Sequence, residues 1–246
     1  MAEAITVKQF LDHADEHLRI GDIILSRSPT FMSWLIRFTT GSAFSHAALV
    51  FLVAKPEEGF NNTFLLESVR EGVGLAKLGE YIGGRRPHSE IAILRLDGEG
   101  LDEVFFKKMR GQMLDRVKSG YDFSRVMRMG LSTAFGFRLG WSTIRKGTPR
   151  SMKDAVVRTR QRLHKWIPPQ FICSGFIQYG LLRAAELCNI STDVVLKDGL
   201  SPYDKDGILA VTPEDVARSS RVTWRFVARR GWVHAVASYD EALRLI

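Results

Sequence analysis

A cysteine is the residue of this chain best suited to nucleophilic chemistry. The apolar spacing that follows Cys173 predicts a helix running to Cys188, the only other cysteine. A thiol attacks a carbonyl carbon as the thiolate, and the positive end of a helix dipole lowers its pKa from about 8.5. Cys173 would lie at that end and Cys188 at the opposite one. Cys173 is therefore the candidate nucleophile. Alternatively, Cys173 is only a small buried apolar residue on the same helix face as Ile177 and Leu181.

His46 is the histidine best placed to serve that cysteine as a base. It alone of six begins a strongly apolar strand, directly after a Gly-Ser-rich turn. An imidazole at the edge of a sheet can reach a helix start and accept its thiol proton. Glu67 ends the next predicted strand, where it could orient the imidazole or simply emerge into water. His13 and His17 have the spacing of metal ligands, but no third ligand lies nearby, so we expect no metal site.

The elements that must position these side chains are short strands and helices. Apolar runs bounded by turn residues predict strands at 23–25, 45–53, 63–69, 73–78, 90–96 and 222–227. Helical spacing predicts helices at 6–19, 31–38 and 101–118, one near 173–188, one opened by Thr212-Pro213-Glu214-Asp215, and a mainly helical stretch over 123–166. This order predicts an α+β fold with an antiparallel sheet.

The composition is that of a globular protein. The 246 residues are 45% apolar, 25% charged and 10% aromatic, which excludes a disordered, collagenous or coiled-coil chain. We expect a single domain over 1–246 with a helical basic insertion at about 124–167. The longest apolar run, Ala47 to Ala54, is far shorter than the roughly 20 residues of a membrane span. No secretory signal opens the sequence, and two cysteines make no disulfide framework, so we expect a cytoplasmic location.

The positive charge is concentrated in one segment. Arg138–Lys165 holds nine Lys and Arg residues against one acid, Asp154, and so accounts for a formal net charge of +8. Such a segment attracts phosphates, and an anionic membrane surface is one partner that it fits. No nucleic-acid-binding motif accompanies it, so we expect no specific nucleic acid. A solvated basic helix is the simpler interpretation, and both remain open.

Several short motifs occur in an order that resembles one family. They are Gly21-Asp22-Ile23-Ile24, Ser45-His46-Ala47-Ala48-Leu49-Val50, Glu67-Ser68 with Gly72-Val73, Gly120-Tyr121-Asp122 and Cys173-Ser174. Together they resemble the circularly permuted, NlpC-like, papain-fold hydrolases of the YiiX type, in which the histidine strand precedes the cysteine helix. The chain departs from that pattern in the long segment before the cysteine and in Gly175, two residues after it.

The resemblance implies both a fold and a set of site residues. It implies a papain-like antiparallel sheet or barrel flanked by helices. It implies Cys173 as nucleophile, His46 as general base and Glu67 as the residue that orients the imidazole. Substrate contacts are implied at Tyr121, Ser174 and Ser45.

The expected activity is that of a cysteine hydrolase or acyltransferase acting through an acyl-enzyme. Neither a metal nor an organic cofactor is required. A peptide or amino-acyl amide is the favoured substrate. A lipid acyl group at an anionic membrane is the alternative, with peripheral membrane association. A non-catalytic binding module that docks an acidic partner through the basic segment is the remaining interpretation.

Overall fold

The computed structural model describes residues 4–82, 90–117, 120–121, 170–190 and 194–246. Its centre is an eight-stranded sheet in the order β1-β10-β9-β6-β2-β3-β4-β5, and all of its neighbouring strands are antiparallel. The strands are β1 Ile5–Thr6, β2 Ile23–Arg27, β3 His46–Leu52, β4 Phe64–Val69, β5 Gly72–Lys77, β6 Glu90–Leu96, β9 Val222–Arg229 and β10 Trp232–Ala235. A separate parallel pair joins β7 (Gly120–Tyr121) to β8 (Gln170–Phe171).

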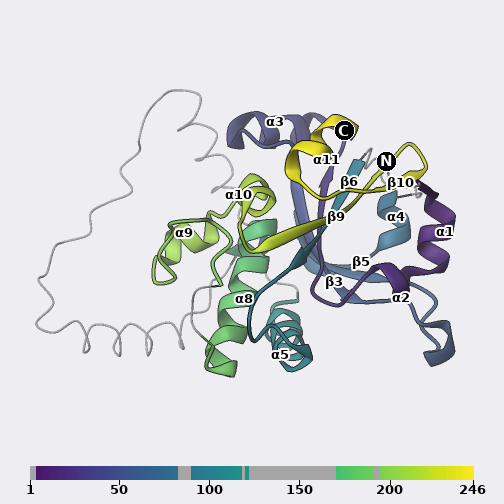
Figure 1. Cartoon of the computed structure of the whole chain (residues 1–246). Coiled ribbons are helices and arrows are strands. Elements are labelled where there is room, and N and C mark those ends of the chain that lie inside the picture. The colour runs from purple at the N-terminus through teal and green to yellow at the C-terminus, as the bar shows by residue number, and fades with distance from the viewer. Residues whose placement is uncertain (1–3, 83–89, 118–119, 122–169, 191–193) are drawn as a thin grey trace, which may run out of the picture.

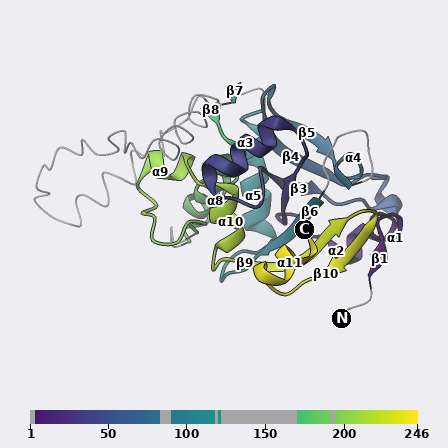
Figure 2. The ribbon, with the colours of Figure 1, turned by 90° about the horizontal axis from the view of Figure 1, so that it is seen from above.

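Helices cover both faces of the sheet (Figure 1). On one face lie α5 (Glu103–Leu114) and α8 (Cys173–Cys188), with α9 (Lys205–Leu209) and α10 (Pro213–Arg218) beside α8 (Figure 2). On the other lie α1 (Val7–Asp12), α2 (Ala14–His17) and α4 (Leu78–Ile82). The remaining elements are α3 (Phe31–Thr40), the short 3₁₀ turn η1 (Pro56–Glu58) and α11 (Tyr239–Leu245). This arrangement is α+β, as the sequence predicts.

Burial on both faces explains the continuous apolar runs of the central strands. Successive side chains of a strand point to opposite faces. Ile23, Leu25 and Leu49 therefore pack with α5 and α8, whereas Ile24 and Ala48 pack with α1 and α4. A central strand covered on both sides has no polar face, and its sequence shows no alternation.

Two expectations about the fold need correction. The sheet is open: among the described residues no pairing joins β1 to β5, so it does not close into a barrel. The helix predicted over 6–19 is two short helices, because His13 between them has φ −118° and ψ 39°, outside the helical region. The helical stretch predicted at 123–166, and with it the basic insertion, lies outside the described residues.

Local signals placed several element ends correctly. Thr30 accepts a hydrogen bond from the backbone N–H of Ser33 and so begins α3. Thr212 and Asp215 form a reciprocal capping box at the start of α10, with Pro213 as its first residue. The C-terminal tail, whose sequence is ambiguous between helix and strand, forms β10 and α11.

Candidate active site

The start of α8 presents Cys173 with free backbone donors around it. The helix is capped by Ile172, whose side chain offers no acceptor to the first-turn N–H groups. The N–H of Ser174 is therefore available to the Cys173 sulfur, and it lowers the pKa of the thiol. Cys173 itself is buried. The helix dipole and these donors favour a thiolate at this position.

His46 and Glu67 come from two adjacent strands, β3 and β4, that both contact α8. His46 is the first residue of β3, and Glu67 lies on β4 opposite Ala48. The imidazole Nε2 and a carboxylate oxygen of Glu67 are 2.9 Å apart. Because Nε2 is held by Glu67, Nδ1 is the ring nitrogen left for the thiol. Glu67 is buried, so the interpretation of this residue as a strand end in water is wrong.

Cys173 and His46, here called the thiol–imidazole pair, stabilise each other's charged form. Burial by itself lowers the pKa of His46, but the Cys173 thiolate, as a charge and as a hydrogen-bond partner, and then Glu67, raise the pKa to about 10. Burial by itself raises the pKa of Cys173, but the His46 imidazolium and the N–H groups of Ala47 and Ser174 lower the pKa below its ordinary value. Both shifts favour a thiolate–imidazolium ion pair.

Ala47 supplies its N–H because of the register of the sheet. The ladder between β3 and β4 begins at Ala48, one residue later. Ala47 pairs with Leu25 of β2 on one side, but on the other side it precedes the ladder with β4, so its N–H is directed to the sulfur instead of to β4. The sulfur is therefore surrounded by two backbone donors from different elements and one imidazole.

Tyr81 is a further residue of this site, and sequence reasoning missed it. It lies on α4, is fully buried, and donates its hydroxyl hydrogen bond to the same oxygen of Glu67 that meets His46. The rings of His46 and Tyr81 are 6.3 Å apart. A buried carboxylate with two donors is held in one orientation, so Tyr81 positions Glu67. An isolated Tyr in a five-residue helix carries no sequence signal for this role.

The serines predicted to contact substrate are bound into the protein instead. Ser174 is fully buried and donates to the carbonyl of Val211. Ser45 is also buried; its hydroxyl lies 2.7 Å from that of Ser33 and donates to the carbonyl of Ser26 at 3.3 Å. Both hydroxyls hold neighbouring segments together around the site. Substrate contact through either side chain would require these hydrogen bonds to break.

Tyr121 is placed by its backbone alone. It pairs with Phe171 in the parallel ladder of β7 and β8, two residues before Cys173. Its side chain is outside what the structure describes, so the predicted contact with substrate stays a prediction. Cys188, at the far end of α8, is half-buried and packs against the core.

Gly175 has a packing reason. A side-chain carbon at this position would lie 2.6 Å from the carbonyl oxygen of Leu209. Glycine therefore lets the first turn of α8 approach the end of α9 closely, which is how Ser174 reaches Val211. Glycine at this position is therefore explained by helix packing.

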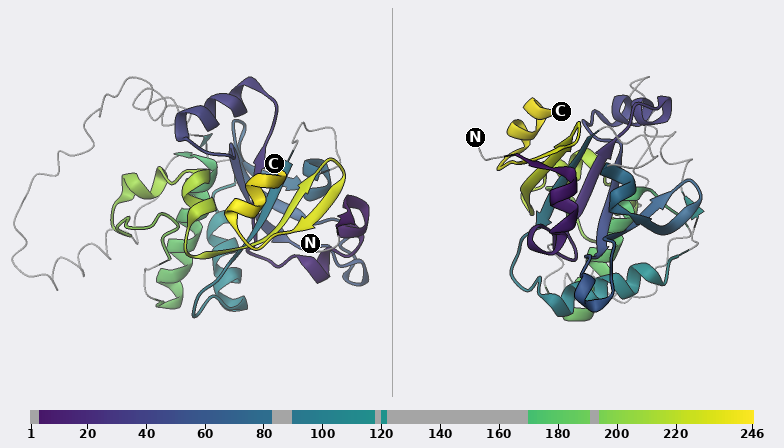
Figure 3. Two further views of the ribbon diagram at one scale, coloured as in Figure 1. Left: turned by 45° about the horizontal axis from the view of Figure 1, so that its top comes forward. Right: turned by 90° about the vertical axis from the view of Figure 1, so that its right-hand side faces the viewer.

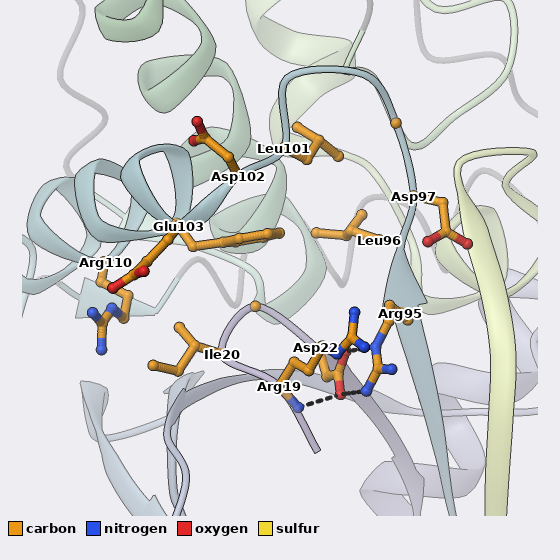
Figure 4. Close-up of a pocket in the computed structure, with 13 residues that line it drawn as sticks. Arg19, Ile20, Asp22, Arg95, Leu96, Asp97, Leu101, Asp102, Glu103 and Arg110 are labelled. Carbon is orange, nitrogen blue, oxygen red and sulfur yellow. Dashed lines mark hydrogen bonds and ion pairs between the residues drawn. The ribbon is translucent and has the colours of Figure 1, made fainter. Parts of the chain in front are cut away.

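The Gly21-Asp22 motif is structural too. Asp22 is buried and accepts two hydrogen bonds of 2.8 Å from the Arg95 guanidinium, and the backbone N–H of Arg19 donates to it (Figure 4). These bonds tie the turn before β2 to β6. A cavity of about 370 Å³ lies between this turn and α5, and none of the predicted site residues lines it.

The described part of the chain contains no cluster of three or more side chains able to hold a metal ion. His13 lies between α1 and α2 with its Nδ1 3.4 Å from a carboxylate oxygen of Glu16, and His17 at the end of α2 stacks on the ring of Phe10. Nor does any described helix have the length and apolar character to cross a membrane.

Comparison with known proteins identifies no family. No family model matches the chain, and no curated protein matches it. Among solved structures, it is similar to one described as the metalloprotein yiiX from Escherichia coli O157:H7, DUF1105, with 18% identity and a TM-score of 0.41. The match covers 85% of this chain and 96% of that one. A likeness of this size supports no inference about the site.

Proposed function

We propose that this protein is a cysteine hydrolase or acyltransferase that cleaves an amide or ester bond. The observation that carries the proposal is the thiol–imidazole pair with Glu67 behind it. Cys173 meets both conditions for a nucleophile, a lowered pKa and an adjacent base, and that base is oriented by a third group. A buried structural cysteine needs none of these neighbours.

The reaction would proceed in two halves. The Cys173 thiolate attacks the carbonyl carbon, and the C–S bond forms while the carbonyl oxygen takes the negative charge. First-turn N–H groups of α8, which no side chain caps, would stabilise this oxyanion. As the bond to the leaving group breaks, the His46 imidazolium gives it a proton. His46 then removes a proton from water or another acceptor, which attacks the thioester and releases Cys173.

The fold agrees with this proposal at the level of element order. The cysteine helix follows the histidine strand in the sequence and packs against it. We therefore propose a permuted papain-like arrangement within the α+β fold. A peptide or amino-acyl amide remains the favoured substrate class. Docking through Arg138–Lys165 stays a prediction, because that segment lies outside the described residues.

Trapping of the acyl group tests the proposal. The protein is incubated with p-nitrophenyl acetate and with amino-acyl p-nitroanilides, quenched in acid, and analysed by intact and peptide mass spectrometry. We expect an acyl mass on Cys173 together with release of p-nitrophenol or p-nitroaniline, both absent in Cys173→Ala. Cys188→Ala is the matched control and should behave as wild type. Absence of any adduct on Cys173 under these conditions would favour the non-catalytic binding module.

A further inference from the structure

α3 buries polar side chains and exposes apolar ones, the reverse of an ordinary amphipathic helix. Its two buried residues are Ser33 and Thr39, both hydroxylic. Four of its six large apolar residues face solvent, since Phe31 is 72% exposed, Met32 40%, Trp34 49% and Phe38 60%, while Leu35 and Ile36 are half-buried. A helix at the surface of a water-soluble domain normally turns its apolar stripe to the core. Water is thus a poor environment for the outer side of α3.

Three of these side chains form one continuous apolar surface, here called the α3 aromatic face (Phe31, Trp34 and Phe38). The ring centroids of Phe31 and Trp34 are 5.8 Å apart, and those of Trp34 and Phe38 are 5.4 Å apart with nearly parallel planes. No apolar residue of α3 belongs to, or packs against, any core cluster of the described chain. A contiguous exposed apolar patch of this kind marks an interaction site.

The aromatic face is presented by a firmly held helix. The Ser33 hydroxyl lies 2.7 Å from that of Ser45, which ties the inner side of α3 to the residue before β3. Thr30 caps its start, and Gly41, with φ 62°, ends it in the left-handed conformation. α3 lies at the edge of the molecule in both views of Figure 3. The exposure of its aromatic side is therefore a feature of a well-anchored helix within the described part of the chain.

The charge around α3 narrows the choice of partner. α3 itself carries no Asp or Glu and one cation, Arg37, whereas Arg27 on β2 is already paired with Glu90 at 2.7 Å. Arg37 is half-buried, and its guanidinium Nε lies 3.4 Å from the carbonyl oxygen of Ser33 one turn earlier. An anionic lipid surface takes up Trp and Phe at the headgroup level and binds Arg to its phosphates, and carboxylates would oppose it.

We propose that the α3 aromatic face docks this protein on an anionic lipid membrane. A helix of ten residues is about 15 Å long, so it would lie in the plane of the interface. Residues 41–45, which span at most about 18 Å, connect it to His46. Docking would therefore bring the edge of the sheet that carries His46 close to the membrane. The proposal does not depend on the chemistry of Cys173.

Vesicle flotation tests the proposal with the full chain. Wild-type protein is mixed with vesicles of phosphatidylcholine and phosphatidylglycerol in a 7:3 ratio, and with vesicles of phosphatidylcholine alone. The test variant is Phe31→Gln/Trp34→Gln/Phe38→Gln. The matched control is Trp232→Gln, because Trp232 on β10 is also 49% exposed but lies on a different element. Circular dichroism and thermal unfolding verify that all variants fold.

We expect wild type, Trp232→Gln and Cys173→Ala to float equally with the anionic vesicles. The triple variant should lose roughly a hundredfold in partition coefficient, since partial burial of each aromatic ring contributes several-fold or more. Arg37→Gln should weaken binding to the anionic vesicles only. Undiminished flotation of the triple variant would overturn the proposal and assign membrane binding to another segment. A wild-type dimer that the triple variant abolishes, with no flotation, would overturn it in favour of a second copy as the partner.

Discussion

Substitution of Cys173 by alanine should lower the pKa of His46 by at least about two units. The pKa of His46 stands at about 10, compared with 6.5 for a free imidazole, and this difference corresponds to about 5 kcal/mol. The two interactions of the imidazolium with Cys173 are each larger than the two with Glu67. Cys173 therefore supplies at least half of a stabilisation that also offsets the cost of burial. Without the thiolate, burial and Glu67 are left to oppose each other.

The pKa of His46 can be followed directly by NMR. Protein with ¹³C-labelled histidine is titrated between pH 5 and 10.5, and the Cε1 resonance of His46 is assigned by its loss in His46→Gln. We expect a midpoint near 10 in wild type and near 8 or lower in Cys173→Ala. Cys188→Ala, which removes the thiol at the other end of the same helix, should leave the midpoint unchanged.

Two results would refute this reasoning. A wild-type midpoint close to 6.5 would mean that His46 has no anionic partner in the folded protein. An identical midpoint in wild type and Cys173→Ala would mean that Glu67 alone holds the imidazolium. In either case the thiol–imidazole pair would not be an ion pair, and the proposed nucleophile would lose its base.

Three further predictions concern the residues around the pair. Tyr81→Phe should cost about 1–3 kcal/mol of stability by thermal or urea unfolding, because the buried Glu67 carboxylate loses a donor, and it should change the pKa of His46 less than Cys173→Ala does. Ser174→Ala should lower the free energy of unfolding by about 1 kcal/mol by removing the hydrogen bond to Val211, and the pH dependence of Cys173 alkylation by iodoacetamide should stay as in wild type. A large loss of acylation without a loss of stability would instead support the predicted contact of Ser174 with substrate. The stability that the thiol–imidazole pair contributes, measured as the difference between wild type and a Cys173→Ala/His46→Gln variant, should be constant between about pH 6.5 and 8.5. Above that range the contributed stability should fall, since only the folded state keeps the imidazole proton up to about pH 10. Below that range it should also fall, since only the unfolded state keeps the thiol proton. A difference in stability that rises steadily across the range would contradict the ion pair.

The local features of this protein follow from its sequence. The capping residues Thr30 and Thr212 and the apolar run of β3 are short-range patterns, and each acts on neighbours within a few residues. The same holds for the position of Cys173 at a helix start, which depends on the spacing that follows it. Helix propensity, capping and period-two burial need no distant partner, so the printed sequence is sufficient to predict them.

The composition of the site depends on register and packing between segments that are far apart. The pairing of β3 with β4 places Glu67 next to His46, and the packing of α4 brings Tyr81 to the same carboxylate. Packing between distant segments also engages the Ser174 and Ser45 hydroxyls in internal hydrogen bonds.

Two larger features also depended on the tertiary structure. The sequence predicts that 31–38 is a helix, but its apolar residues say nothing about which side is covered, and the fold leaves the aromatic side open. Whether the sheet closes into a barrel likewise depends on which strands pair, and among the described residues β1 and β5 do not pair. Local patterns are set by the backbone's own hydrogen bonds, whereas the neighbours of a side chain are set by how all elements pack at once.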